Sequence, residues 1–264
     1  MITNKEKLTA LIITYNEIGY IEKCIDSISF ADEIIVVDSF STDGTYEYLK
    51  AHPKVRVIQN PFDNFTAQKS FALKQATHDW VLFLDADEIV SNSLEEEIKQ
   101  TISSGTEIVA FWFYRQFMFK NEKLNYSGWQ TDKNYRLFRK SKTKFSDCKI
   151  VHETLDVAGD SGILQEKLIH YCYKNYDDYK DKMLKYGRLK AIESFYKEKK
   201  YSYVMMGLKT SWKFFNHYIL RLGILDGKKG FIICYLNALG VLERFKELKR
   251  LEQKNELAYY LVMP

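Results

Sequence analysis

The first hundred residues of this chain alternate between short apolar runs and segments with helical character. The apolar runs are Leu8–Thr14, Glu33–Asp38, Val55–Ile58 and Trp80–Leu84. The intervening helical segments are Ile18–Ile28, Thr45–Ala51 and Phe65–Ala76. Strands that alternate with helices favour a parallel sheet whose connections are right-handed crossovers. We therefore predict an α/β fold with a mostly parallel sheet flanked by helices.

Beyond residue 105 the pattern changes to further strands and then to long helices. The predicted strands are Ile108–Phe119, Asn134–Arg139 and Ile163–Tyr171. The predicted helices are Tyr179–Lys199, Tyr203–Leu222 and Gly230–Gln253, with a loop over 225–230. We expect one domain over 1–172, made of halves at about 1–105 and 106–172. A C-terminal helical region over 173–264 is expected to pack on it.

The charge of the chain is distributed unevenly along its length. Residues 1–170 carry 20 Lys and Arg against 25 Asp and Glu, whereas residues 171–264 carry 19 against 10. A basic C-terminal part suits contact with an anionic surface, and it equally suits helices whose charged faces are solvated.

The cysteines and the apolar runs indicate a protein of the cytoplasm. Cys24, Cys148, Cys172 and Cys234 are widely separated, as expected for reduced thiols. The first residues are polar as far as Lys7, so we expect no signal peptide. No apolar run reaches the ~18 residues that a membrane-spanning helix needs.

Three carboxylates follow the strand at 80–84, namely Asp85, Asp87 and Glu88. Ligands of open α/β sheets bind at the carboxyl ends of the strands. Two aspartates separated by one small residue offer hard oxygen ligands to Mg²⁺ or Mn²⁺, and substrate phosphates complete the coordination. The stretch predicts a metal–nucleotide site. We give Glu88 no role in it beyond favouring the start of the next helix.

Polar side chains also follow the first two strands. A carboxylate such as Asp38 accepts hydrogen bonds from a base, and Tyr15 has a ring that stacks on a base or ribose. The alternative is that these segments only begin the next helices, because Asn16 and Asp43 are good N-cap residues.

Taken together, the segments 12–17, 32–45 and 85–88 resemble a family 2 glycosyltransferase of the GT-A fold. The subgroup that they resemble adds sugars to the lipopolysaccharide core or to similar surface glycans. The segments 151–153, 159–162 and 225–227, together with His170, extend the similarity.

The resemblance implies roles for matching positions. Residues 1–105 would hold the nucleotide sugar and 106–172 the acceptor. Asp85 would hold the ribose or the waters of the metal, and Asp87 would ligate Mg²⁺ or Mn²⁺, with His170 as a second metal ligand. The side chains expected to line the nucleoside pocket are Thr14, Tyr15, Glu17 and Asp38. His170 read by itself is equally consistent with a structural histidine.

Three basic residues are further candidates. Lys69 lies on the predicted helix after Phe65 and could contact the base or the phosphates. Arg136 and Arg139 are read as alternating along one face of a strand, where a guanidinium grips a diphosphate or an acceptor phosphate. Exposed strand charges are the alternative.

An inverting sugar transfer needs a carboxylate that takes the proton of the acceptor hydroxyl. The resemblance implies an acidic residue at this point of the chain. Glu153 is the candidate, because its neighbour His152 is not acidic. Asp156 is a more distant substitute, and a structural glutamate is the competing interpretation.

The C-terminal helices place Trp212 and Phe215 among lysines such as Lys209 and Lys213. Basic residues beside aromatic ones suit a peripheral helix on an anionic membrane. They suit equally a helix packed on the catalytic domain, with lysines extending outward.

We therefore predict an inverting, metal-dependent glycosyltransferase that moves a sugar from a nucleotide sugar, expected to be UDP-linked. Its acceptor would be a glycan or a lipid-linked glycan, such as the lipopolysaccharide core, and no nucleic-acid partner is expected. The protein would be cytoplasmic, with peripheral contact at the inner membrane. Two alternatives are a nucleotidyltransferase, disfavoured by the single glycine in the segment 14–19, and a non-catalytic nucleotide-sugar or glycan-binding module.

Overall fold

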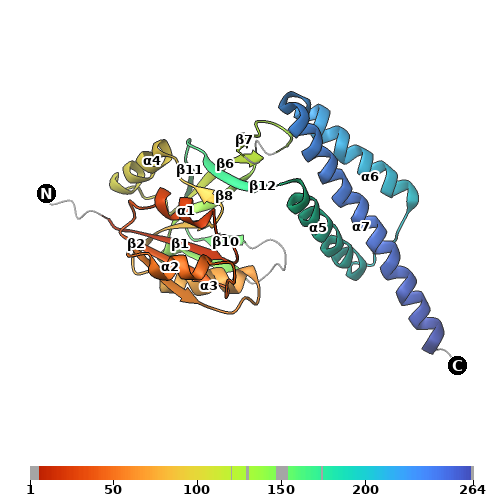
Figure 1. Ribbon diagram of the computed structural model, residues 1–264, viewed down its shortest axis with the longest axis horizontal. Helices are drawn as coiled ribbons and strands as arrows, with labels where there is room; N and C mark the ends of the chain where they lie inside the picture. The colour runs from red at the N-terminus through yellow and green to blue at the C-terminus, as the bar shows by residue number, and fades with distance from the viewer. Residues whose placement is uncertain (1–5, 120, 129–130, 147–153, 174, 263–264) are drawn as a thin grey trace. The chain divides into compact units, whose positions relative to one another are not determined.

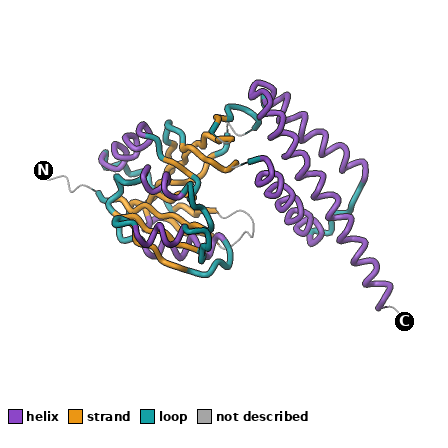
Figure 2. The backbone as a smooth tube through the Cα atoms, viewed as in Figure 1, coloured by secondary structure: helices purple, strands orange, loops and turns teal. Residues whose placement is uncertain are grey.

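A computed structural model describes residues 6–119, 121–128, 131–146, 154–173 and 175–262. The chain divides into two compact units (Figures 1 and 2). The first comprises residues 1–116 and 131–171, and the second comprises 117–130 and 172–264. The sequence predicts a single boundary near 172, whereas the segment 117–130 groups with the second unit.

Four parallel strands form one half of the sheet in the first unit. They are β1 (Leu8–Thr14), β2 (Glu33–Asp38), β3 (Val55–Gln59) and β4 (Trp80–Asp85), in the spatial order β3-β2-β1-β4. The helices that connect them are α1 (Ile21–Ser27), α2 (Thr45–Ala51) and α3 (Phe65–Gln75). The predicted α/β fold with flanking helices is confirmed.

The other half of the sheet is mixed. Beyond β4 the order continues with β8 (Lys133–Arg139), β6 (Ala110–Phe119), β12 (Leu168–Tyr173) and β5 (Glu88–Ile89). The pairs β4–β8, β8–β6 and β12–β5 are antiparallel. The short strands are β7 (Glu122–Lys123) and β11 (Ser161–Ile163), which pair with β6, and the separate pair β9 (Thr143–Ser146) and β10 (Thr154–Val157).

The prediction of one strand over Ile163–Tyr171 is wrong, because the chain turns between β11 and β12. The amide groups of Gln165 and Glu166 donate to the carboxylate of Glu97, at 2.8 and 2.9 Å. Glu97 lies on α4 (Asn92–Ser103), a helix for which the sequence interpretation gave no bounds. The side chain of Glu97 thus satisfies two backbone amides of the turn that interrupts the predicted strand.

Both faces of the parallel strands are covered by apolar side chains. Leu11, Val81 and Phe83 pack with residues of α3, whereas Ala10, Ile12 and Leu82 pack on the opposite face with residues of α1 and α4. Successive residues of a strand point to opposite faces, so a strand buried on both sides is apolar throughout. This explains why the runs at 8–14 and 80–84 were recognisable.

The second unit is mainly helical. Its helices are α5 (Tyr176–Tyr196), α6 (Tyr203–Phe215) and α7 (Gly227–Val262), with a π-helical turn at Asn216–Leu220 and a 3-10 turn at Gly223–Asp226. In the part of the chain that the structure describes, no helix is both long and apolar enough to cross a membrane.

The loop expected over 225–230 is not observed, since α7 already begins at Gly227. Asp226 is buried and accepts hydrogen bonds from the amides of Asn125 and Tyr126, at 3.0 and 2.9 Å. A Cβ on Gly230 would lie 2.0 Å from the carbonyl oxygen of Gly223. Asp226 therefore binds the backbone of another segment, and Gly230 allows two backbone segments to approach closely.

Candidate active site

Three predicted site residues lie together at the carboxyl edge of the parallel strands. Thr14 at the end of β1 is aligned with Asp38 at the end of β2, and Ile13 is aligned with Asp85 at the end of β4. Thr14 Oγ1 is buried, and among the residues that the structure describes it has no hydrogen-bond partner. A ligand at this edge would meet an unsatisfied hydroxyl group.

Asp38 is buried and organises the loop that follows β2. Its carboxylate accepts hydrogen bonds from the amide of Ser41 at 3.1 Å, from the hydroxyl of Ser41 and from Gln59 Nε2 at 3.2 Å. The carboxylate is therefore held in a fixed position at the end of β2.

Side-chain hydrogen bonds join the loop after β1 to the loop after β2. Asn16 donates its amide to Ser41 Oγ at 2.9 Å, and its side-chain oxygen accepts from the amide of Thr42 at 2.8 Å. The amide of Glu17 donates to Thr45 Oγ1 at 3.0 Å. Next to these bonds, Tyr15 is exposed.

The N-cap interpretation of Asn16 and Asp43 is wrong. The residues at the N-cap positions of α1 and α2 are Tyr20 and Gly44. Asp43 instead accepts hydrogen bonds from the amides of Ile18 and Thr45, at 3.1 and 3.0 Å. Asn16 has a φ of 55°, in the left-handed region that costs energy for most residues. Both side chains hold the loops in place.

A buried ion-pair cluster lies beside Asp85. Arg136 Nη2 contacts a carboxylate oxygen of Asp85 and lies 2.6 Å from Glu88 Oε1. Glu88 Oε2 accepts a hydrogen bond from the amide of Asp85 at 3.0 Å. Burial would raise the pKa of Asp85, but the charges of Arg136 and Lys69 outweigh it and hold that pKa well below its usual range.

Glu88 is the residue of this site that the sequence interpretation missed. It lies in β5 and is fully buried, so its assignment to the start of the next helix is wrong. Arg115 Nη1 is 3.5 Å from Glu88 Oε1, and Arg115 Nε donates to Asp132 at 2.7 Å. A third carboxylate directly after Asp85 and Asp87 was the available signal, but its arginine partners are distant in sequence.

Arg136 and Arg139 make different contacts from β8. The pairing of β8 with β6 shifts register at Arg136, so simple alternation along the strand does not describe the two side chains. Arg136 is buried in the carboxylate cluster, which also excludes exposed strand charge as its description. The guanidinium of Arg139 lies over the ring of Trp80, 4.4 Å from its centroid.

Lys69 on α3 is also buried near the cluster. Its Nζ lies 3.8 Å from Asp85 Oδ1 and 5.6 Å from the centroid of the Phe83 ring. The structure thus places Lys69 next to one of the two predicted donor-binding aspartates.

Asp87 and His170 form a pair of potential metal ligands. His170 Nε2 lies 3.3 Å from Asp87 Oδ2. The pairing of β12 with β5 aligns His170 with Glu88, and the amide of Tyr171 donates to the carbonyl of Asp87 at 2.9 Å. Within the described ranges no group of three or more His, Cys, Asp or Glu side chains is arranged to hold a metal ion. A carboxylate oxygen next to an imidazole nitrogen nevertheless fits Mg²⁺ or Mn²⁺ bound partly by substrate phosphates.

The predicted site residues fall into three groups. Lys69, Asp85, Asp87, Arg136 and His170 lie in and around the ion-pair cluster. Thr14 and Asp38 end the neighbouring strands, and Tyr15 and Glu17 lie in the loop after β1. Glu153 and His152 lie outside the described residues.

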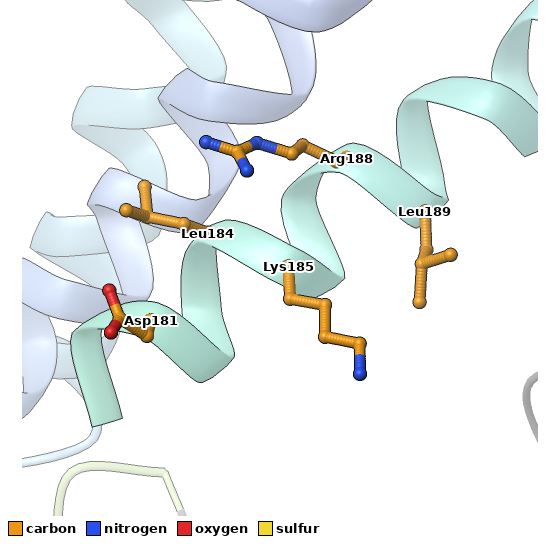
Figure 3. Close-up of a pocket in the computed structure, with 5 residues that line it drawn as sticks. All are labelled: Asp181, Leu184, Lys185, Arg188 and Leu189. Carbon is orange, nitrogen blue, oxygen red and sulfur yellow. The ribbon is translucent and has the colours of Figure 1, made fainter. Parts of the chain in front are cut away.

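A separate hollow lies along α5 in the second unit (Figure 3). Its lining residues are Asp181, Leu184, Lys185, Arg188 and Leu189, all from one helix. Arg188 Nε donates a hydrogen bond to Glu243 Oε1 at 2.8 Å. The hollow contains none of the clustered carboxylates, so we assign the chemistry to the carboxyl edge of the sheet.

Known proteins with similar sequences place this chain among the glycosyltransferases. It is 29% identical over 266 residues to an uncharacterized glycosyltransferase of Rickettsia felis, covering 96% of this chain and 94% of that protein. It is also 29% identical over 252 residues to the lipopolysaccharide core biosynthesis glycosyltransferase LpsC of Rhizobium meliloti, covering 91% and 93%.

The family profile described as "Glycosyl transferase family 2" matches residues 9–159, which is more than half of the chain. The chain therefore belongs to glycosyltransferase family 2. Among solved structures, S. aureus TarS 1–349 in complex with UDP aligns with a TM-score of 0.48 and 15% identity, covering 94% of this chain and 92% of that one.

Proposed function

We propose that this glycosyltransferase is metal-dependent and inverting, and that it moves a sugar from a nucleotide sugar to a surface-glycan acceptor. The observation that carries the proposal is the pair Asp87 and His170 beside the Asp85–Arg136–Glu88 cluster, at the carboxyl edge of the parallel strands. The name of LpsC supports a lipopolysaccharide-core acceptor. We place the reaction at the cytoplasmic face of the inner membrane, where a lipid-linked acceptor would be met.

The donor nucleoside, expected to be uridine, would bind over the ends of β1 and β2. Thr14 offers a buried hydroxyl group, and Tyr15 has an exposed ring that is free to stack. The hydrogen bonds that Asn16 makes with Ser41 and Thr42 hold the two loops in register, so the pocket is formed before the ligand arrives. Glu17 and Asp38 complete the proposed pocket.

Asp87 and His170 would hold Mg²⁺ or Mn²⁺, and the metal would neutralise the negative charge of the leaving nucleoside diphosphate. Asp85 is kept ionised by Arg136 and Lys69, so it can accept hydrogen bonds from the ribose or from water on the metal. Glu88 acts through Arg136 as a positioning residue. Lys69 lies close to Asp85, so a ligand that contacts Asp85 would also lie near the ammonium group of Lys69.

Glu153 is the proposed general base. Its carboxylate would take the proton of the acceptor hydroxyl as the acceptor oxygen bonds to the anomeric carbon. The bond from that carbon to the diphosphate oxygen breaks, and its electron pair leaves with the diphosphate. A single displacement of this kind inverts the configuration of the sugar.

The test is a survey of nucleotide sugars with Mn²⁺ that measures release of nucleoside diphosphate and transfer to candidate acceptors. We expect Asp87→Asn to lower turnover by about a hundredfold or more. Glu153→Gln should bind the donor normally but transfer no sugar. Asp160→Asn, an exposed aspartate of the same unit, serves as the matched control. Full transfer by Glu153→Gln, or turnover of Asp87→Asn equal to the control, would contradict these roles.

A further inference from the structure

One side of α6 is apolar and faces solvent. Its large side chains recur every three or four residues, and this spacing keeps them on one face of the helix and of the π-helical turn that follows. Leu208 is 62% exposed and Trp212 is 58% exposed. We call this set the α6 stripe, and its members are Val204, Leu208, Trp212, Phe215 and Ile219.

The other side of α6 supplies its internal packing. α6 lies along α7 (Figure 1), and the ring of Phe214 contacts the ring of Phe231 with 5.7 Å between centroids. No residue of α6 itself is fully buried. Contiguous exposed apolar surface on a soluble protein marks an interaction site, because hydrating it costs free energy. The stripe therefore needs an occupant other than α7.

The charge of the segment that carries the stripe favours one occupant. Residues 199–242 contain seven Lys and Arg and one acidic residue, Asp226, and of the seven Lys229 pairs with the exposed Glu122 at 2.9 Å. Asp226 is buried and bound to backbone amides, so it offers no exposed negative charge. The basic residues are Lys199, Lys200, Lys209, Lys213, Arg221, Lys228 and Lys229. A second copy of the same surface would bring like charges together, which disfavours self-association.

We infer that the α6 stripe docks on an anionic membrane surface. An amphipathic helix lies in the membrane interface with its apolar side chains at the acyl boundary and its cations near the headgroups. Leu208 and Trp212 supply the apolar contact, and the excess of cations in the same segment supplies the attraction to acidic lipid. The inference uses no residue of the carboxylate cluster, so it stands or falls separately from the proposed catalysis.

The test is flotation of the full chain with vesicles in the absence of any nucleotide sugar. Vesicles of phosphatidylcholine with phosphatidylglycerol should carry the protein to the top of the gradient, and vesicles of phosphatidylcholine alone should carry much less. Added salt should weaken the binding because it screens the charges. Leu208→Ser combined with Trp212→Ser should lower the partition coefficient by about tenfold or more.

The matched control is Leu189→Ser combined with Tyr196→Ser, which removes one leucine and one aromatic residue from α5, both also exposed. The control should bind vesicles as the wild type does, and thermal unfolding should show both double variants folded. Equal binding to neutral and anionic vesicles, or unchanged binding of the α6 variant, overturns the inference. A wild-type dimer without lipid that the α6 variant abolishes also overturns it, because the occupant is then a second copy.

Discussion

Glu88 Oε1 lies 2.6 Å from Arg136 Nη2, and both side chains are buried. The same guanidinium contacts the carboxylate of Asp85. The second oxygen of Glu88 accepts a hydrogen bond from the backbone amide of Asp85. Arg136 is therefore held from two sides and in turn fixes the first aspartate of the Asp-Ala-Asp-Glu segment. The position of Asp85 depends on a pairing between residues 48 positions apart.

Replacing Glu88 by Gln should destabilise the protein by about 3 kcal/mol, because it leaves the buried charge of Arg136 with one carboxylate fewer. Chemical denaturation measures this loss. Glu96→Gln removes an exposed glutamate paired with Lys99 and should change stability by less than about 1 kcal/mol. Equal stability of the two variants would contradict a structural role for Glu88.

The backbone of Asn16 predicts an order of two substitutions. Asn16→Ala loses the hydrogen bond to Thr42 and also forces alanine into a φ of 55°. Asn16→Gly loses only the hydrogen bond. We expect unfolding free energies lowered by about 2 kcal/mol for Ala and about 1 kcal/mol for Gly. A glycine variant less stable than the alanine variant would show that φ is not the source of the cost.

Two helical glycines of the second unit should respond to alanine in opposite directions. A Cβ on Gly187 in α5 would lie 2.5 Å from the carbonyl oxygen of Gly240 in α7, whereas nothing lies within 4 Å of a Cβ on Gly207 in α6. Gly187→Ala should cost about 2 kcal/mol or more, since backbone must move. Gly207→Ala should stabilise by about 0.5–1 kcal/mol. Thermal unfolding compares them, and a stabilising Gly187→Ala would refute the close approach of α5 and α7.

Two buried thiols should be slow to react in the native protein. Burial raises the pKa of Cys24 well above its usual value. The negative charges of Glu88, Asp87 and Asp85 raise it further. Burial also raises the pKa of Cys234 to about 11. Since the thiolate is the reactive species, alkylation near pH 8 should be slower by about a hundredfold than in the unfolded chain. Peptide mass spectrometry reads each site separately, and rapid native labelling of Cys24 would contradict its burial.

Three strands of the parallel half, β1, β2 and β4, were predictable because they are buried on both faces. Leu11, Val37 and Phe83 stand in continuous apolar runs, and periodicity needs no tertiary information to find them. The helix α4 was given no bounds, although Leu94, Ile98 and Ile102 recur at helical spacing and are buried. That signal was present in the sequence and was not used.

Other features depend on contacts between residues that are distant in the sequence. The pairing of β12 with β5 brings His170 to Asp87, and no local pattern specifies it. The burial of Glu88 likewise requires Arg136 and Arg115 from two other strands. The sequence could nominate Asp85, Asp87, Arg136 and His170 as site residues, but neither Arg115 nor the pairing of both arginines with Glu88.

The most direct test of the account is the binding of UDP to the wild-type chain with and without Mn²⁺, measured by titration calorimetry. If Asp87 and His170 hold the metal against the diphosphate, Mn²⁺ should tighten UDP binding by about tenfold or more. Asp87→Asn and His170→Ala should each abolish that gain, and Asp160→Asn should retain it. UDP affinity that is independent of Mn²⁺, or an Mn²⁺ effect that survives Asp87→Asn, would contradict the proposed site.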